Sequence, residues 1–220
     1  MVSPYDKSQN IEQKRAIAKH AASLVQNSAI IGLGSGSTME LFVEALAERM
    51  EYEQLSLSFV ASSKKIEAIA RQYQFQIKNI ESLEHIDQAF DGADCIDRQH
   101  NLIKGGGGSL FRERQLLLMA NEKYILADDS KFVEHFANLP IPLEIVPFNI
   151  KFTVRKLEEK GFRCKIRGDK NTAFITDNGN LIVDIVYSEE NTIEKVFHQL
   201  KMQFGVVEVG IFLNDKHILL

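Results

Sequence analysis

The chain has 220 residues, a formal net charge of -4 and no long run of basic residues. A length of this order suits one large domain, or one medium domain with a smaller partner. The acidic balance argues against nucleic acid as the main partner, and it gives no reason to expect binding to an anionic membrane surface. No apolar run is long enough to span a bilayer, and the first 28 residues lack the apolar core of a secretory signal.

The side chains that usually bind transition metals are few and scattered. Cys95 and Cys164 lie far apart, neither belongs to a C-x-x-C pair, and the six histidines show no metal-binding spacing. We therefore expect a cytoplasmic protein with reduced thiols, without a metal or any other cofactor. No obvious base lies beside Cys95 in the sequence, which disfavours a reactive thiol at this position.

The first elements of the chain suggest a phosphate site. An amphipathic helix is predicted over residues 11–26, with Lys14 and Arg15 on its solvated face. A strand over 28–33 then runs directly into Gly34-Ser35-Gly36-Ser37-Thr38, and a helix follows. Free amides at the start of that helix and the hydroxyls of the loop can all donate to one phosphate.

By itself this loop is ambiguous. It reads G-x-G-x-G from Gly32, but Ser37 stands where the dinucleotide fingerprint G-x-G-x-x-G needs a glycine. The next strand, over 55–61, is followed by Ser62-Ser63-Lys64-Lys65 and not by the acid that dehydrogenases use for the ribose. A nucleotide-linked dehydrogenase is therefore disfavoured, while a plain strand-to-helix turn stays open as an alternative.

The stretch from residue 91 to residue 114 concentrates carboxylates, a lysine and glycines. A strand over 86–90 is predicted to bring Asp91 and Asp94 to the carboxyl edge of the sheet, where open α/β sheets bind ligands. Each acid taken singly has an ordinary interpretation as a turn or capping residue. Their density in one short stretch favours a chemical site.

Four consecutive glycines, 105–108, follow Lys104 in this stretch. Glycines allow positive φ angles and close approach of backbone amides to an oxyanion. A helix is predicted to follow, with Ser109 as its N-cap and Glu113 in or near its first turn. A strand over 124–127 then ends just before Lys131. The alternation of strands and helices predicts an α/β fold: a Rossmann-like, mostly parallel sheet with helices on both faces.

The pattern changes at Pro140 and Pro142, which favour an extended connection. The elements expected beyond it are a strand from Leu143, a helix over 151–160, strands over 162–166, 173–176 and 181–186, a helix over 192–203 and a strand over 206–213. This order predicts a smaller α+β, ferredoxin-like lid domain. We place the α/β catalytic domain at residues 1–137, with the return of 209–220, and the lid at 138–208.

Two local signals refine the lid. Asp177-Asn178-Gly179-Asn180 predicts a hairpin turn between two of its strands. Asn191 and Glu194 fit the N-cap and N3 positions of its last helix.

The motifs taken together resemble the A-type ribose-5-phosphate isomerases. The matching segments are Gly34 to Thr38, Asp91-Gly92-Ala93-Asp94, Asn101 to Gly108, Arg112-Glu113, Asp129-Ser130-Lys131 and Leu139 to Pro147. They occur in the order of the family over most of the chain. Each segment alone is a weak signal, whereas the ordered set is highly specific.

The resemblance implies metal-free interconversion of D-ribose 5-phosphate and D-ribulose 5-phosphate in the non-oxidative branch of the pentose phosphate pathway. It implies that Glu113 is the base that moves a proton between C1 and C2, and that Asp91, Asp94 and Lys104 are catalytic residues that contact the sugar. Such a reaction passes through an enediolate and needs one mobile base together with donors for the charge on oxygen. The substrate-binding residues implied in the same way are Ser35, Gly36, Ser37, Thr38, Asp91, Gly92, Ala93, Asp94, Lys104, Gly105, Gly106, Gly107 and Lys131.

One position departs from the family pattern. The family usually reads D-G-A-D-E, and here the fifth residue is Cys95. Because this position is not the base, we expect activity to survive. The family is usually oligomeric, so we also expect a homodimer or a dimer of dimers.

Two other functions stay open as alternatives. A sugar-phosphate-sensing effector domain of a transcription regulator would normally carry a DNA-binding segment, and the 28 residues before the first strand are too few for one. Another phosphosugar enzyme of the same broad fold, such as an amino-sugar phosphate deaminase, would lack this order of motifs.

Overall fold

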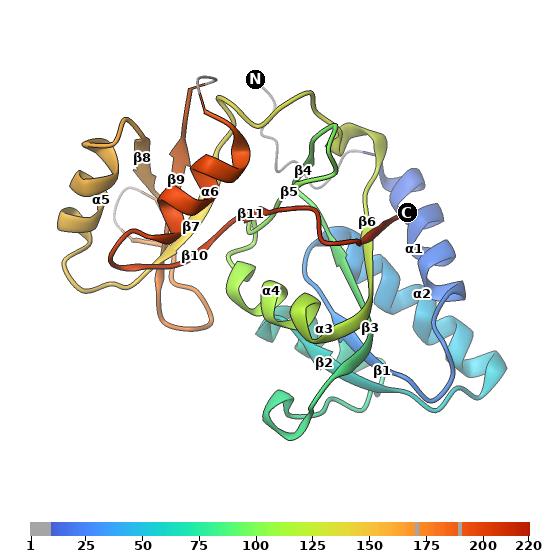
Figure 1. Ribbon diagram of the computed structural model, residues 1–220. Helices are drawn as coiled ribbons and strands as arrows, with labels where there is room; N and C mark the ends of the chain where they lie inside the picture. The colour runs from blue at the N-terminus through green and yellow to red at the C-terminus, as the bar shows by residue number, and fades with distance from the viewer. Residues whose placement is uncertain (1–9, 170–171, 189–190) are drawn as a thin grey trace. The chain divides into compact units, whose positions relative to one another are not determined.

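The computed structural model describes residues 10–169, 172–188 and 191–220, and Figure 1 shows its elements. The chain forms two compact units. Unit 1 contains the described residues up to Ala93, together with Arg112–Lys131 and Asp215–Leu220; unit 2 contains Asp94–Phe111 and Phe132–Asn214. The chain thus passes from unit 1 to unit 2 after Lys131 and returns at Asp215, and residues 94–111 belong to unit 2. The domain boundaries inferred from sequence stay a prediction.

Unit 1 is built on a five-stranded sheet with the order β12-β6-β3-β1-β2, and its strand pairs are all parallel. The strands are β1 (Ile30–Leu33), β2 (Ser58–Ala61), β3 (Ile86–Gly92), β6 (Ala120–Leu126) and β12 (Ile218–Leu219). The helices are α1 (Ile11–Ser23), α2 (Ser37–Glu53), α3 (Lys64–Gln72) and α4 (Leu110–Met119). Buried side chains of α1, α2 and α3 belong to one core together with those of β1, β2 and β3, and Figure 1 shows α4 in front of the sheet, away from α1 and α2. The predicted α/β fold is confirmed.

The strand order places a switch point between β1 and β3. From β1 the chain crosses through α2 to β2 on one side, whereas from β3 it continues to β6 on the opposite side. In open α/β sheets, ligands bind beyond the carboxyl ends of the strands at such a point. The carboxyl end of β1 leads into the Gly34 to Thr38 loop, and β3 ends with Asp91 and Gly92. The fold of unit 1 therefore brings two of the predicted motifs to neighbouring strand ends.

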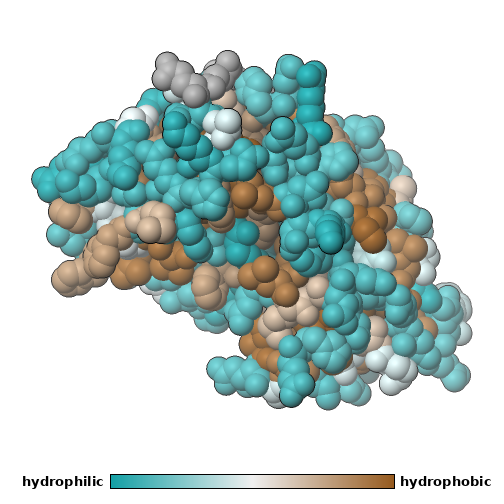
Figure 2. Space-filling model, viewed as in Figure 1, coloured by the Kyte–Doolittle hydropathy of each residue, from teal (hydrophilic) through white to brown (hydrophobic). Residues whose placement is uncertain are grey.

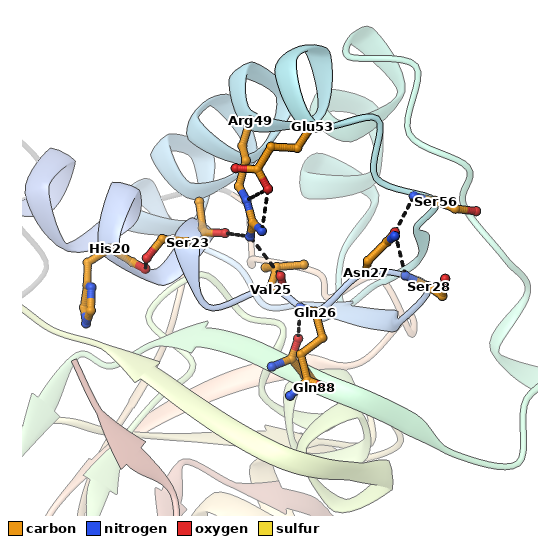
Figure 3. A network of polar contacts seen from close by, with 11 residues as sticks. His20, Ser23, Val25, Gln26, Asn27, Ser28, Arg49, Glu53, Ser56 and Gln88 are labelled. Atoms are coloured by element: carbon orange, nitrogen blue, oxygen red, sulfur yellow. Dashed lines mark hydrogen bonds and ion pairs between the residues drawn. The ribbon is translucent and has the colours of Figure 1, made fainter.

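Aromatic stacking and buried polar contacts fix this sheet. Phe90 stacks on Phe42 of α2 at 4.6 Å between ring centroids and on Tyr124 of β6 at 4.7 Å. Stacked pairs of this kind contribute about 0.5–1.5 kcal/mol beyond their buried area. Figure 3 shows Arg49 of α2, which donates to the backbone carbonyls of Ala22 in the last turn of α1, at 2.7 Å, and of Val25 just after that helix, at 2.8 Å. Arg49 thus satisfies one carbonyl of the last helical turn and holds the start of the connection to β1 in place.

Unit 2 contains a four-stranded antiparallel sheet and a smaller three-stranded one. The first has the order β10-β7-β9-β8 and the second the order β11-β5-β4. The elements are β4 (Cys95–Ile96), β5 (Leu102–Ile103), β7 (Ile141–Ile145), α5 (Ile150–Glu158), β8 (Arg163–Ile166), β9 (Leu181–Val186), α6 (Ile193–Lys201), β10 (Val206–Val209) and β11 (Ile211–Phe212). Alternate residues of β7, Ile141, Leu143 and Ile145, share one core with Leu157 of α5 and Leu200 of α6. The smaller α+β unit predicted from the sequence is confirmed, and the structure shows that its four-stranded sheet is antiparallel.

The predicted strand over 206–213 is wrong in one respect, because it is broken at Gly210. Its halves, β10 and β11, belong to different sheets. The amide of Gly210 donates to the Pro142 carbonyl at 2.7 Å, and its own carbonyl accepts from the Lys104 amide at 2.9 Å. A Cβ at this position would lie 2.4 Å from the Lys104 carbonyl oxygen. Only glycine allows the backbone to come this close to two neighbours.

Three other local predictions need correction. Residues 173–176 form only isolated bridges, Gly168 with Ala173 and Ile175 with Leu181, so they do not make the expected strand. The last helix is capped by Thr192, whose side chain accepts from the Lys195 amide, and not by Asn191. The extended connection expected at the prolines is shorter, because Pro142 already lies inside β7.

The surface of unit 2 carries exposed apolar side chains. Phe148, Met202 and Phe204 are 85%, 82% and 87% exposed. The two segments that carry them are joined by a hydrogen bond of 2.9 Å from the Val146 amide to the Gly205 carbonyl. Figure 2 shows apolar side chains gathered at the left edge of the visible face, where Figure 1 places α5 and β10.

Candidate active site

The glycine loop of unit 1 is shaped by its contact with β3. The Gly34 amide donates to the Phe90 carbonyl at 2.8 Å. A Cβ on Gly34 would lie 2.1 Å from Oδ1 of Asp91, so a side chain at this position would displace that acid. Gly36 has a φ of 106° and forms the N-cap position of the 17-residue helix α2. Gly34 therefore allows the close approach of the loop to Asp91, and Gly36 supplies the positive φ angle, as the sequence suggests.

The hydroxyls of this loop divide into two sets. Ser35 Oγ donates to Oε1 of Glu113 at 2.6 Å. The side chains of Ser37 and Thr38, in the first turn of α2, make no hydrogen bond to another residue in the part of the chain that the structure describes. A helix N-terminus with two available hydroxyls suits a phosphate, because the amides and the helix dipole favour an anion.

Two buried carboxylates lie beside the loop. Asp91 is 2% exposed, and its Oδ1 accepts from the amides of Ser35 at 3.2 Å and Gly92 at 2.8 Å. Glu113 is 3% exposed and lies in the first turn of α4, which begins one residue after Ser109 as predicted. Unit 1 thus brings together residues from three distant segments. A buried carboxylate near a phosphate-binding loop can act as a base on a phosphorylated substrate.

A buried lysine was missed by the sequence analysis. Lys14 was placed on the solvated face of α1, but it is only 2% exposed, and its Nζ lies 3.8 Å from Oδ2 of Asp128. Arg15 is solvated as predicted, with 49% of its side chain exposed. Lys14 precedes Ala18 by four residues and Ala21 by seven, and both are fully buried. This spacing places all three on one helix face, and it is the signal that could have located Lys14.

Asp128 joins this lysine to the segment that contains Lys131. The Lys131 amide donates to the Asp128 carbonyl at 2.9 Å, in the short helix Asp129–Lys131. Burial raises the pKa of Asp128, but hydrogen bonds from Ser130 and Asn10 and the charge of Lys14 outweigh burial and hold that pKa below its usual value. The carboxylate is therefore stabilised in its ionised form.

This pKa shift gives a prediction for stability. A carboxylate whose pKa is lower in the folded state than in the unfolded state stabilises the fold at any pH above its unfolded-state pKa of about 3.9. This stabilisation is lost as the pH falls through the folded-state pKa. We expect Asp128→Asn to lower the unfolding free energy by about 3 kcal/mol at pH 7, because it removes the buried carboxylate that lies 3.8 Å from the Lys14 ammonium group. The difference from wild type should shrink below about pH 4. Urea unfolding at several pH values measures it, with the exposed Asp215→Asn as control; a difference independent of pH would contradict the assignment.

Unit 2 holds the remaining predicted residues. Oδ2 of Asp94 accepts from the Gly106 amide at 2.7 Å. Lys104 is 3% exposed, and its ammonium group lies 5.7 Å from the centroid of the Phe212 ring. Gly105 has a φ of 102°, which an L side chain rarely adopts. Unit 2 therefore fixes the glycine run together with the acid and the lysine that flank it in sequence.

Arg167 is a second residue that sequence analysis missed. It follows β8, and its Nη1 donates to the carbonyls of Gly105 at 2.8 Å and Gly106 at 2.9 Å. Its Nε donates to Oδ2 of Asp184 at 3.0 Å, and its Nη2 forms a second bond to the same carboxylate. The planar guanidinium thus joins β9 to the glycine run. Arg167 lies more than 60 positions from these glycines along the chain, so the contact leaves no signal in the local sequence.

We expect Arg167→Lys to lower kcat/KM by roughly 10- to 100-fold, because a lysine cannot contact both carbonyls and Asp184 at once. The matched control is Arg163→Lys, an exposed position on β8. Steady-state kinetics on both variants measures the effect. Equal activity of the two variants would show that the Arg167 contacts do not matter for the site.

The catalytic and substrate-binding residues predicted from the sequence are therefore divided between the two units. Unit 1 contains Ser35, Gly36, Ser37, Thr38, Asp91, Gly92, Ala93, Glu113 and Lys131, and unit 2 contains Asp94, Lys104, Gly105, Gly106 and Gly107. The chain passes between the units inside the D-G-A-D motif and again inside α4.

The described residues contain no group of three or more His, Cys, Asp or Glu side chains placed to hold a metal ion. Cys95 is 6% exposed within β4. Burial, with a smaller effect of Glu158, raises the pKa of the Cys164 thiol to about 11. Among the helices in the described ranges, none is long and apolar enough to cross a membrane.

Comparisons with known proteins extend over almost the whole chain. A family model described as ribose 5-phosphate isomerase A (phosphoriboisomerase A) matches residues 58–220, and one described as the DeoR C terminal sensor domain matches residues 9–72. Ribose-5-phosphate isomerase A of Bacillus mycoides is 38% identical over 204 residues, which are 92% of each protein. The structure of ribose 5-phosphate isomerase A from Methanocaldococcus jannaschii has a TM-score of 0.87 at 37% identity and covers 94% of both chains. A D-ribose-5-phosphate isomerase in complex with phospho-erythronic acid has a TM-score of 0.87 at 31% identity, covering 94% of this chain and 93% of that one.

Proposed function

The chain belongs to the ribose 5-phosphate isomerase A family, and we propose that it interconverts D-ribose 5-phosphate and D-ribulose 5-phosphate without a metal. The reaction belongs to the non-oxidative branch of the pentose phosphate pathway. The observation that carries this proposal is the buried Glu113, held beside the phosphate-binding loop in unit 1. The family match also includes Lys104 and the whole of unit 2.

We assign phosphate binding to the start of α2 and to nearby cations. Gly36, Ser37 and Thr38 offer backbone amides and two hydroxyls. Lys131 follows the carboxyl end of β6, two strands from β1 in the sheet order, and supplies a positive charge. A phosphate held by fixed groups positions the sugar, so that its binding energy is used at the reacting carbons.

The proton transfer falls to Glu113. Its carboxylate removes the proton from C2 of the open-chain aldose, and the C–H electron pair forms the enediolate while O1 gains negative charge. The hydroxyl proton on O2 passes to O1, and the protonated Glu113 returns its own proton to C1, which gives the ketose. Lys104 stabilises the charge on oxygen as a cationic donor, and Asp91 and Asp94 bind the sugar hydroxyls and assist ring opening. Base and cation together supply what the chemistry requires.

The sensing-domain alternative receives less support. The sensor-domain model matches only residues 9–72, which contain the glycine loop but neither Glu113 nor Lys104. Phosphosugar binding is common to both functions, whereas a base and an oxyanion donor serve only catalysis. The solved relative that holds phospho-erythronic acid binds a ligand with a phosphate and a carboxylate.

The test is the conversion of ribose 5-phosphate by the purified protein in EDTA. We expect a kcat on the order of 1 to 10³ s⁻¹, which is typical of metabolic enzymes. Tight binding of the sugar phosphate without turnover would favour the sensing domain. Turnover that disappears in EDTA and returns with a divalent cation would contradict metal independence.

We also propose that the protein acts in the cytoplasm as a homodimer or a dimer of dimers. The exposed Phe148, Met202 and Phe204 support association, because apolar side chains of this size are seldom left together in solvent. Light scattering at micromolar concentration should give two or four times the mass of one chain. The mass of a single chain would contradict this proposal.

A further inference from the structure

A short hydrogen bond joins the phosphate-binding loop to the proposed base. Ser35 Oγ donates to Oε1 of Glu113 at 2.6 Å. This length is typical of a hydroxyl that donates to a carboxylate, and such charge-assisted bonds are roughly twice as strong as neutral ones. The two residues are 78 positions apart in the chain, and both lie in unit 1.

The backbone around Ser35 sets the direction of this hydroxyl. The Ser35 amide donates to Oδ1 of Asp91 at 3.2 Å, and the preceding Gly34 amide donates to the Phe90 carbonyl at 2.8 Å. Both partners belong to β3, so two successive residues are held against the end of that strand. Because backbone and side chain are both bonded, Ser35 is pre-organised before any substrate arrives.

Ser35 differs in this respect from the other hydroxyls of the loop. It precedes Gly36, the N-cap residue of α2, so it lies outside the first helical turn. Ser37 and Thr38 lie inside that turn, where the helix amides favour an anion. The sequence assigns all these residues to one phosphate, whereas the structure directs one of them to the carboxylate of Glu113.

We propose that Ser35 is a positioning residue for the isomerisation, which acts by holding the carboxylate of Glu113; this inference rests on the proposed function. The hydrogen bond to Oε1 occupies that oxygen and fixes the plane of the carboxylate. Oε2 therefore takes the proton from C2 and returns it to C1, so that one oxygen serves both half-reactions. Ser35 itself gains and loses no proton and keeps donating to Oε1 throughout.

Three single variants separate this role from phosphate binding. Ser35→Ala removes the hydroxyl and should lower kcat by roughly 10- to 100-fold with KM changed by less than about threefold, because the base is misplaced while the phosphate contacts stay. Ser35→Thr keeps a hydroxyl and should restore most of kcat. Ser37→Ala should instead raise KM, since it removes a phosphate donor. Thermal unfolding confirms that each variant is folded.

A double variant shows whether Ser35 acts through Glu113. If it does, Ser35→Ala should cause little further loss in residual activity when Glu113 is already glutamine, because residues that act as a unit are not additive. Full additivity would overturn the proposal, as would a Ser35→Ala variant with raised KM and unchanged kcat, or a threonine variant as slow as the alanine one. An inactive wild type would instead contradict the proposed function.

Discussion

Replacing Glu113 by glutamine should abolish most of the activity and leave substrate binding intact. Glutamine has nearly the same shape and its side-chain oxygen can still accept from Ser35, but an amide cannot take a proton from carbon. We expect kcat to fall by roughly 10³-fold or more, within the range found for a general base in proton transfer. Steady-state kinetics gives kcat, and calorimetry with phospho-erythronic acid measures binding.

The control for this variant is Glu51→Gln, which makes the same substitution at an exposed position on α2. Both variants should unfold at nearly the same temperature as wild type. If the Glu113 variant keeps full activity, the base has been placed on the wrong residue. If it loses phospho-erythronic acid binding together with activity, Glu113 is needed to form the site and not only for proton transfer.

Replacing Lys104 by methionine should cause the second largest loss. Methionine keeps an unbranched apolar side chain beside Phe212, but it removes the ammonium group that we propose as donor to the developing oxyanion. Loss of one such donor costs roughly 10² to 10³ in kcat. Lys104 is fixed by the hydrogen bond of 2.9 Å from its amide to Gly210, so the substitution should leave the backbone in place.

Lys165→Met serves as control, because this lysine is exposed on β8 in the same unit. Kinetics on both variants should show a low kcat only for the change at Lys104. A kcat equal to wild type would remove Lys104 from the catalytic set, and a rise in KM alone would limit its role to binding.

Much of the fold follows from local patterns in the sequence. The apolar strand before Gly34 and the helix after Thr38 are short-range signals, and the structure contains β1 and α2 at these positions. Likewise the apolar run over 86–90 predicts a strand without any tertiary information. The structure contains this strand as β3, and Asp91 lies at its carboxyl end. The order of these motifs along the chain sufficed to identify the family.

Other features depend on contacts that the local sequence does not encode. The short strands β4 and β5 exist because they pair with each other and with β11, and their two-residue patterns give no periodic signal. The contact of Arg167 with the glycine run arises only after the antiparallel sheet has formed. The direction of the Ser35 side chain depends on the close approach of β1 and β3. The local sequence does not show this approach, so the sequence analysis assigned Ser35 to the phosphate.

The fate of the carbon-bound proton tests the central claim most directly. Wild type and Glu113→Gln are incubated with ribose 5-phosphate in D₂O with EDTA for many cycles of interconversion, and NMR follows the sugar carbons. In the proposed mechanism the proton resides on the Glu113 carboxyl group between the two half-reactions, so it can exchange with solvent. We expect wild type to accumulate deuterium at C1 of the ketose and C2 of the aldose, and the variant to accumulate almost none. Interconversion by wild type without any deuterium at these carbons would contradict proton transfer through Glu113.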